Sequence, residues 1–154
     1  MHTNFKIYYF IQNFNLKELS NIKKSINIIF RNYHNNDYID DLIKTRNYCK
    51  KKGFKLYLSN NINLAIKLRL DGVYLPSFNN DLKHINFPKK KNFFIIGSAH
   101  NNKEIKRKEL QKVDLIFIAS LFNKKLGYKN FTSKKKFRII GSAHNISEIK
   151  IKEK

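Results

Sequence analysis

The amino-acid sequence predicts an α/β fold built on a parallel sheet. Two observations support this prediction. Short and nearly continuous apolar segments recur along the chain, as expected for strands that are buried on both faces of a sheet. Longer amphipathic, lysine-rich segments separate them, and regular alternation of strands and helices is typical of parallel α/β proteins. The predicted strands span residues 6–11, 27–31, 55–58, 72–75, 93–98, 115–119 and 137–140.

Three of the intervening segments have a helical pattern, over residues 37–52, 61–70 and 102–112. Gly53 predicts the end of the first, because glycine readily adopts the left-handed conformation that ends many helices. Apolar residues recur on one side of the first two helices at helical spacing, and the third carries two apolar residues among charges. These residues are Tyr38, Leu42, Ile43, Tyr48, Ile62, Ala65, Ile66, Leu70, Ile105 and Leu110.

The chain length bounds the fold. It has 154 residues, enough for one domain with its own core, and we expect a single domain over residues 1–154. A complete barrel of eight strand–helix units typically needs about 250 residues. Seven strands are one fewer than such a barrel has, and they leave open sheet edges. An open barrel, or one that a partner chain closes in a homo-oligomer, is the resulting hypothesis.

The charge of the chain is strongly positive. Lysine and arginine total 32 residues against 11 aspartate and glutamate residues, which gives a formal net charge of +21. Such a balance fits nucleic acid, an anionic membrane or phosphorylated small molecules as partners. The abundance of Lys, Asn, Ile, Phe and Tyr also fits the coding bias of an AT-rich genome. Charge alone therefore identifies no partner.

Cysteine content and hydropathy indicate the compartment. Cys49 is the only cysteine, which excludes an internal disulfide and fits a reducing environment. The apolar segment 5–11 is too short for a signal-peptide core or a membrane span. We therefore expect a cytoplasmic protein without a membrane segment.

An internal repeat is also present. Residues 91–101 recur almost unchanged at 135–145, 44 residues later, and both copies contain Ile-Ile-Gly-Ser-Ala-His-Asn. Solenoids need three or more repeats, so two near-identical copies suggest a local duplication or a sequence artefact. A truncated gene product that does not fold alone is one hypothesis that follows.

The first copy of this repeat carries the clearest chemistry. Gly97 and Ser98 end a predicted strand and precede a predicted helix. Glycine permits a tight turn, a serine hydroxyl donates to phosphate oxygens, and a helix N-terminus presents free N–H groups. In α/β barrels such turns lie on the face that carries the active site. The alternative to a phosphate site is that Ser98 or Asn101 only caps the helix.

Other polar residues have structural interpretations. Asp71 and Asp114 each precede a predicted strand, where we expect their carboxylates to accept hydrogen bonds from nearby backbone N–H groups. His100 and His144 are expected to be turn residues. No group of histidines, cysteine and carboxylates has the spacing of a zinc site.

Several motifs surround the Gly-Ser turn in a defined order. They are Ser59-Asn60, Asp71-Gly72-Val73-Tyr74-Leu75, Gly97-Ser98-Ala99-His100 with Glu104, and Val113-Asp114-Leu115-Ile116-Phe117. This order resembles the thiamine-phosphate synthase and TenI family, and the resemblance covers residues 5–131. It implies a TIM-barrel-like (β/α) fold, here truncated to about seven β/α units.

The resemblance also implies an activity. Synthases of this family join hydroxymethylpyrimidine pyrophosphate to a thiazole phosphate and release pyrophosphate, with Mg²⁺ as cofactor. This implies a transferase of thiamine biosynthesis whose substrates are phosphorylated small molecules. Departure of the pyrophosphate would leave a pyrimidine carbocation, so the protein would neutralise the leaving group and align the partners.

Site residues follow from the resemblance position by position. Arg31 matches a pyrophosphate-binding arginine, for which the forked guanidinium is well suited. Ser98 matches the serine of the phosphate turn, and these two residues are the expected catalytic ones. Lys124 and Lys125 lie in the region of a phosphate-binding loop. Gly141 takes the place of a turn that holds the thiazole phosphate.

The expected metal site departs from the family pattern. Asn60 and Asn79 stand where the family has Mg²⁺-binding aspartates, and Asp81 is near enough in sequence to substitute for them. Asn60 is also an expected substrate contact. Mg²⁺ prefers anionic oxygen ligands, whereas an amide supplies a neutral carbonyl. Tyr33 replaces a lysine of the family.

Two further hypotheses stand beside the enzyme. One is a TenI-like protein that binds a phosphate ligand without catalysis. The other is a basic nucleic-acid-binding module, in which the aromatic segments 8–10 and 93–94 stack on bases. These segments fit buried strands better.

Overall fold

The computed structural model describes residues 6–34, 37–86, 90–118 and 138–141. The strands are β1 (Ile7–Ile11), β2 (Ile26–Phe30), β3 (Leu56–Ser59), β4 (Gly72–Leu75), β5 (Phe94–Ala99), β6 (Leu115–Ile118) and β7 (Arg138–Gly141). The helices are α1 (Leu16–Ser20), α2 (Ile39–Lys52), α3 (Ile62–Lys67), the short 3-10 helix η1 (Lys83–Asn86) and α4 (Asn102–Leu110).

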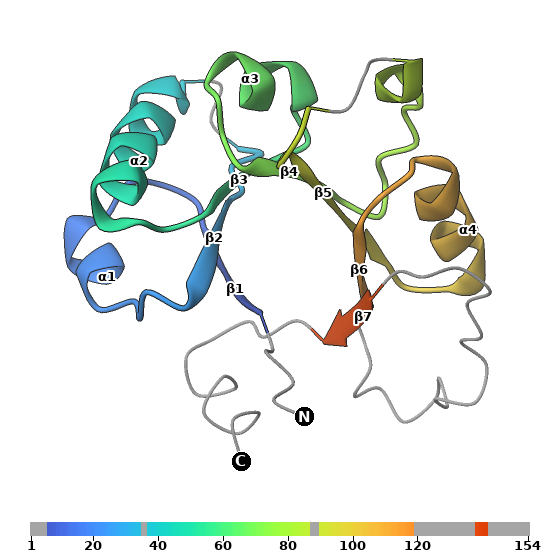
Figure 1. The fold of residues 1–154 in the computed structure, drawn as a ribbon, viewed down its shortest axis with the longest axis horizontal. Helices are drawn as coiled ribbons and strands as arrows, with labels where there is room; N and C mark the ends of the chain where they lie inside the picture. Colours follow the sequence, from blue (N-terminus) through green and yellow to red (C-terminus); the bar gives the residue numbers. More distant parts are fainter. Residues whose placement is uncertain (1–5, 35–36, 87–89, 119–137, 142–154) are drawn as a thin grey trace.

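The seven strands form one sheet in the order of the sequence, and all neighbouring strands are parallel. Figure 1 shows the sheet curled around a central axis, with helices α1 to α4 on its outer side. Within the described residues, β1 and β7 are the two edges of the sheet. This arrangement is a TIM-barrel-like fold of seven strands, which confirms the predicted fold class.

The predicted strands agree with the observed ones to within one residue, apart from their ends at Ala119 and Phe137, which lie outside the described residues. Each of the three predicted helices is longer than the observed one by two to four residues. None of the helices in the described part of the chain has the length and apolarity needed to span a bilayer.

Helix α1 and the 3-10 helix η1 were not predicted. A sequence signal for α1 does exist, because Asn15 caps it by accepting a hydrogen bond from the Glu18 N–H at 3.1 Å. An Asn three residues before a Glu is a common start of a helix. The five-residue length of α1 leaves too few apolar positions for a helical period to be recognised.

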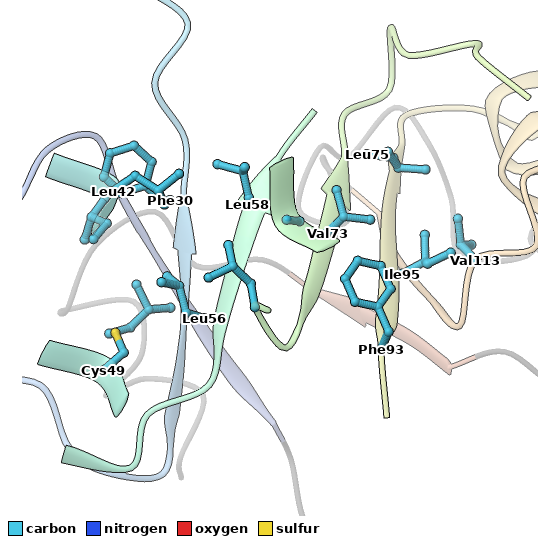
Figure 2. Close-up of a cluster of buried hydrophobic side chains, with 14 of the residues drawn as sticks. Phe30, Leu42, Cys49, Leu56, Leu58, Val73, Leu75, Phe93, Ile95 and Val113 are labelled. Atoms are coloured by element: carbon cyan, nitrogen blue, oxygen red, sulfur yellow. The ribbon is translucent and has the colours of Figure 1, made fainter. Parts of the chain in front are cut away.

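A hydrophobic core fills the space between the sheet and its outer helices (Figure 2). Helix α2 contributes the buried residues Leu42, Thr45 and Cys49, whose spacing keeps them on one helix face. Gly53 ends this helix in the left-handed conformation, with a φ of 79°, as predicted. Ile43 is 37% exposed, so its predicted place on the apolar side is wrong, because it lies one residue beyond the buried row.

A second, aromatic cluster fills the inside of the curled sheet. Its buried members are Tyr8, Ile29, Tyr57, Tyr74, Ile96, Leu115 and Phe117, with Phe10 and Phe94 packed against them. The rings meet edge to face, and the centroids of Tyr8 and Phe117 are 5.0 Å apart. The inside of the curled sheet is therefore a packed core, as in α/β barrels. Three of its aromatic residues, Phe10, Tyr74 and Phe117, also line the pocket described below.

The Asp-Gly pair before β4 has a structural role. Asp71 Oδ2 accepts a hydrogen bond from the Leu56 N–H at 2.9 Å, so a backbone N–H is its partner as predicted, but this partner begins β3, 15 residues away, and is not in the local segment. Asp114 Oδ2 accepts one from the Ile95 N–H at 2.8 Å in the same way. A Cβ atom at Gly72 would collide with the Phe94 carbonyl, so glycine is required for the close approach of β4 and β5.

Candidate functional site

A pocket of about 200 Å³ opens at the carboxyl ends of the parallel strands. Its wall comes from strands β1, β4, β5 and β6 and from the residues that follow β2, β4 and β5. The lining residues are Phe10, Arg31, Tyr33, Tyr74, Pro76, Ser77, Phe78, Ser98, His100 and Phe117. Active sites of α/β barrels lie at this end of the strands.

Arg31 is the only lysine or arginine among these lining residues. It directly follows β2, and its backbone N–H donates to the Ile11 carbonyl at 2.7 Å. Its guanidinium carbon lies 4.6 Å from the centroid of the Phe10 ring, a cation–π contact that orients the side chain. The structure thus places this predicted residue in the pocket, where a forked cation can bind an anionic group.

Ser98 also lies where the sequence predicts it. It is 6% exposed and lines the pocket beside Tyr74. Burial raises the pKa of the Tyr74 hydroxyl, and a hydrogen bond with Ser98 and the positive charge of Arg31 offset part of this rise. Tyr74 therefore stays protonated at neutral pH, and it supplies a second hydroxyl at the pocket floor.

Asn101, and not Ser98, caps helix α4. Asn101 Oδ1 accepts from the Glu104 N–H at 3.0 Å, while Glu104 accepts from the Asn101 amide at 2.9 Å. Glu104 also accepts from the His100 N–H at 2.7 Å and lies 3.0 Å from its ring nitrogen. Because the cap is made by Asn101, the Ser98 hydroxyl is left for the pocket.

The rim of the pocket is aromatic. The Tyr33 hydroxyl lies 2.6 Å from the Ser59 hydroxyl, and its ring meets that of Phe78 edge to face at 5.7 Å. Burial raises the pKa of Tyr33, against the lowering effects of the Ser59 hydrogen bond and the Arg31 charge. Phe78 is 61% exposed, a large apolar side chain at the mouth of the pocket.

The three predicted metal ligands lie beside this pocket, and their oxygens are engaged by protein donors. The Asn79 amide donates to Asn60 Oδ1 at 2.7 Å. Asn79 Oδ1 accepts from the Asp81 N–H at 3.1 Å and from the Gln111 amide at 2.8 Å. Asp81 Oδ1 accepts from the Lys83 N–H at 2.8 Å.

This donor set does not fit Mg²⁺, which favours several anionic oxygens in octahedral geometry. One carboxylate is present, and it caps η1, while both amide oxygens face N–H groups. No cluster of three or more His, Cys, Asp or Glu side chains suited to a metal occurs within the described residues. The expected role of Asn60, Asn79 and Asp81 as a metal site is therefore not supported by their geometry.

Lys108 was missed by the sequence reasoning. It is fully buried, and its ammonium donates to the Pro76 carbonyl at 2.7 Å, the Asn79 carbonyl at 2.9 Å and Gln111 Oε1 at 2.9 Å. Burial lowers the pKa of Lys108 to about 8, against the raising effect of the Glu104 carboxylate. The amine is therefore still mainly protonated at pH 7, and it anchors the segment that forms one wall of the pocket.

Gly97 makes room for this lysine. It lies within β5 and not in a turn, so its predicted role in a tight phosphate-binding turn is wrong. A Cβ atom there would lie 2.9 Å from Lys108 Cδ and 3.2 Å from a methyl group of Val113. Leu110 is 58% exposed, while Lys108 and Gln111 are fully buried.

The remaining predicted residues are only partly described. Lys124 and Lys125 lie outside the described residues. Gly141 ends β7, where its backbone is paired in register with Ile118 at the carboxyl end of β6. This places Gly141 at the same end of the sheet as Ser98, which is paired with Phe117.

A curled parallel sheet with a polar and aromatic pocket at the carboxyl ends of its strands places the chain in the α/β-barrel class, whose members carry their sites at this end. A family model described as thiamine monophosphate synthase matches residues 17–151. This match spans most of the chain, so the chain belongs to the thiamine monophosphate synthase family. No curated protein sequence matches it significantly.

Solved structures support the fold. The thiamine phosphate pyrophosphorylase from Pyrococcus furiosus has a TM-score of 0.63 and 15% identity, over 90% of this chain and 75% of that chain. The U32 peptidase Mk0906 has a TM-score of 0.53 and 12% identity, over 77% of this chain and 60% of that chain. At these identities the likeness shows a shared fold.

Proposed function

We propose that the chain binds the phosphorylated precursors of thiamine and couples hydroxymethylpyrimidine pyrophosphate to a thiazole phosphate. The position of Arg31 carries this proposal, because it brings one forked cation to a pocket otherwise lined by rings and hydroxyl groups. Membership of the thiamine monophosphate synthase family supports the substrate class.

Each part of the pyrimidine substrate has a counterpart in the pocket. The guanidinium of Arg31 and the hydroxyl of Ser98 suit the pyrophosphate oxygens. The rings of Phe10, Tyr74 and Phe117 suit the planar heterocycle. Gly141, Lys124 and Lys125 are the proposed contacts of the thiazole phosphate, because they match the phosphate-binding segments of the family.

The proposed reaction begins when the bond between the pyrimidine methylene carbon and the pyrophosphate oxygen breaks. The leaving group takes the electron pair, and Arg31 neutralises part of its charge. The carbocation that remains is stabilised by the aromatic faces around it. The lone pair of the thiazole nitrogen then forms the new carbon–nitrogen bond, and pyrophosphate is released.

A coupling assay tests this proposal. Purified protein is incubated with both substrates, with and without Mg²⁺, and thiamine phosphate is measured by chromatography. We expect product from the wild-type chain and a loss of at least about tenfold in Arg31→Met, because the leaving group then lacks its cation. Absence of product under all conditions would refute the coupling activity.

A second candidate function is binding without coupling, as in a TenI-like protein. The hydrogen bond between Asn60 and Asn79 favours it, because amides stand where the synthases of the family carry carboxylates. Calorimetry with each substrate separates the two functions. Binding of either phosphate without product supports this second function, whereas binding of neither refutes both.

A further inference from the structure

The loops that follow β3 and β4 are joined by side-chain amides. The Asn79 amide nitrogen donates to Asn60 Oδ1 at 2.7 Å. Asn60 adopts a φ of 62°, a conformation that asparagine tolerates well, and its N–H donates to the Tyr74 carbonyl at 2.8 Å. The contact therefore connects two loops at the carboxyl end of the sheet, directly beside the pocket.

The buried ammonium group of Lys108 stabilises this contact through hydrogen bonds to Asn79 and Gln111. Lys108 donates to the Asn79 carbonyl at 2.9 Å and to Gln111 Oε1 at 2.9 Å. The Gln111 amide in turn donates to Asn79 Oδ1 at 2.8 Å and to the Asp81 carbonyl at 2.9 Å. We call these four residues, Asn60, Asn79, Lys108 and Gln111, the amide clamp. Within it, each amide oxygen and the ammonium group has a protein partner.

The charge of the clamp explains why no divalent cation is needed to hold it. Two carboxylates at the distance between Asn60 and Asn79 would repel each other and would need a cation between them. Two amides attract each other instead, since one donates and the other accepts. The positive charge is supplied from inside the protein by the fully buried Lys108.

We propose that the amide clamp takes the structural place of the divalent cation that synthases of this family use, so that the two loops are joined without a metal. This inference follows from the bonding of the four residues and does not depend on which ligand the pocket binds. It predicts that restoring the two carboxylates creates a divalent-cation site.

Mn²⁺ titration followed by electron paramagnetic resonance tests the proposal, with thermal denaturation in MgCl2 as a second readout. The variant Asn60→Asp with Asn79→Asp should bind Mn²⁺ at least about tenfold more tightly than the wild type, because two anionic ligands then face each other. Its midpoint of denaturation should fall in the absence of metal and rise again with Mg²⁺. The wild-type midpoint should be the same in MgCl2 and in NaCl of equal ionic strength.

A matched control carries the same change in charge. In Asn60→Asp with Asn80→Asp the second carboxylate lies on an exposed neighbour, whose amide donates to the Phe78 carbonyl at 3.2 Å and not to a residue of the amide clamp. This variant should gain clearly less Mn²⁺ affinity and less Mg²⁺-dependent stability than the paired variant, because only one of its two carboxylates lies at the contact between the loops. Equal gains in the control and in the paired variant would overturn the proposal, because charge alone would then explain them.

Two further outcomes would also overturn it. One is stoichiometric Mn²⁺ binding by the wild type that Asp81→Ala abolishes. The other is a paired variant that folds normally and gains no metal affinity. If the paired variant does not fold, the single variant Asn79→Asp provides the test, because it places one carboxylate beside Asn60 and should bind Mn²⁺ more tightly than the wild type. Metal binding equal to that of the wild type would contradict the proposal.

Discussion

At the scale of single residues, Lys108 has the largest influence on the shape of the site. Its ammonium satisfies two backbone carbonyls and one side-chain amide in a fully buried position. Gly97 provides the space for its side chain on the neighbouring strand. The wall of the pocket formed by the segment after β4 therefore depends on a residue that does not line the pocket itself.

Replacement of this lysine by an apolar residue of similar length tests its role. Lys108→Met leaves three buried acceptors without their donor, which should cost about 1–3 kcal/mol in the free energy of unfolding. Urea denaturation measures this loss. The control is Lys106→Met, an exposed lysine on the same helix, which should change stability by about 0.5 kcal/mol or less. Equal stability of the two variants would contradict the role of Lys108.

Sequence reasoning succeeded where the position of a residue at a strand end indicates its role, and failed where a residue is buried among partners from distant segments. The capping roles of Asp71 and Asp114 were predictable from their positions before strands. Arg31 was found by resemblance and Ser98 by its place between a strand and a helix, and the structure places both in the pocket. Lys108 was not found, because lysine is rarely fully buried and its partners lie about 30 residues away in sequence.

At the scale of elements, helix α4 begins with a side-chain cap that also lowers the pKa of Glu104. Asn101 and Glu104 exchange hydrogen bonds, and Glu104 also accepts from His100. Partial burial raises the pKa of Glu104, but the hydrogen bonds and charge of His100 and the bond from Asn101 outweigh it. The pKa is therefore lower than the usual value in the folded state.

This lowered pKa predicts a pH dependence of stability. The unfolded state binds the proton more tightly, so the contribution of Glu104 is present above the ordinary glutamate pKa and is lost as the pH falls through the lower folded-state value. Glu104→Gln should destabilise the protein by about 0.5–1 kcal/mol at pH 7, and the difference from the wild type should shrink below about pH 4. Urea denaturation of both proteins at pH 7, 5 and 3.5 measures this difference in the free energy of unfolding.

The control for this prediction is Glu109→Gln on the same helix, away from its N-terminus. Its effect on stability should be smaller at pH 7, because the carboxylate there makes no cap. A constant difference between Glu104→Gln and the wild type across the acid range would show that the ionised carboxylate does not stabilise the helix.

The strands were more predictable than the helices for a physical reason. A strand that is buried on both faces reads as a continuous apolar segment, and all seven were found. Helices α1 and η1 have five and four residues, too few for a 3.6-residue period to be visible. In α4 a buried lysine, Lys108, takes a core position, and the buried Gln111 follows as the C-cap, so the apolar residues alone do not mark the buried face of this helix.

At the scale of the whole molecule, the net charge of +21 raises the question whether the chain binds nucleic acid through its surface, independently of the pocket. The aromatic residues Tyr8 and Phe93, which belong to segments considered for base stacking, are 6% and 8% exposed. They are therefore part of the two cores. Any binding of RNA by this chain is expected to be electrostatic and independent of sequence.

Salt dependence distinguishes the two kinds of binding. RNA binding should weaken steeply between 50 and 200 mM salt, by roughly 10³-fold if about six phosphates are contacted. Binding of inorganic pyrophosphate in the pocket should weaken much less, because few charges are involved. Fluorescence anisotropy and calorimetry over the same salt range measure both. RNA binding in the low micromolar range with this steep salt dependence would favour a nucleic-acid-binding module, whereas tight binding that ignores salt would not.

The central claim is that the pocket around Arg31 and Ser98 binds phosphorylated thiamine precursors. Isothermal titration calorimetry with hydroxymethylpyrimidine pyrophosphate tests it most directly, comparing the wild type with Arg31→Met and with Lys44→Met, which removes one charge from the exposed surface of α2. We predict saturable binding that weakens at least about tenfold in Arg31→Met and is unchanged in Lys44→Met. Equal affinity in all three proteins, or no binding to the wild type, would contradict the claim.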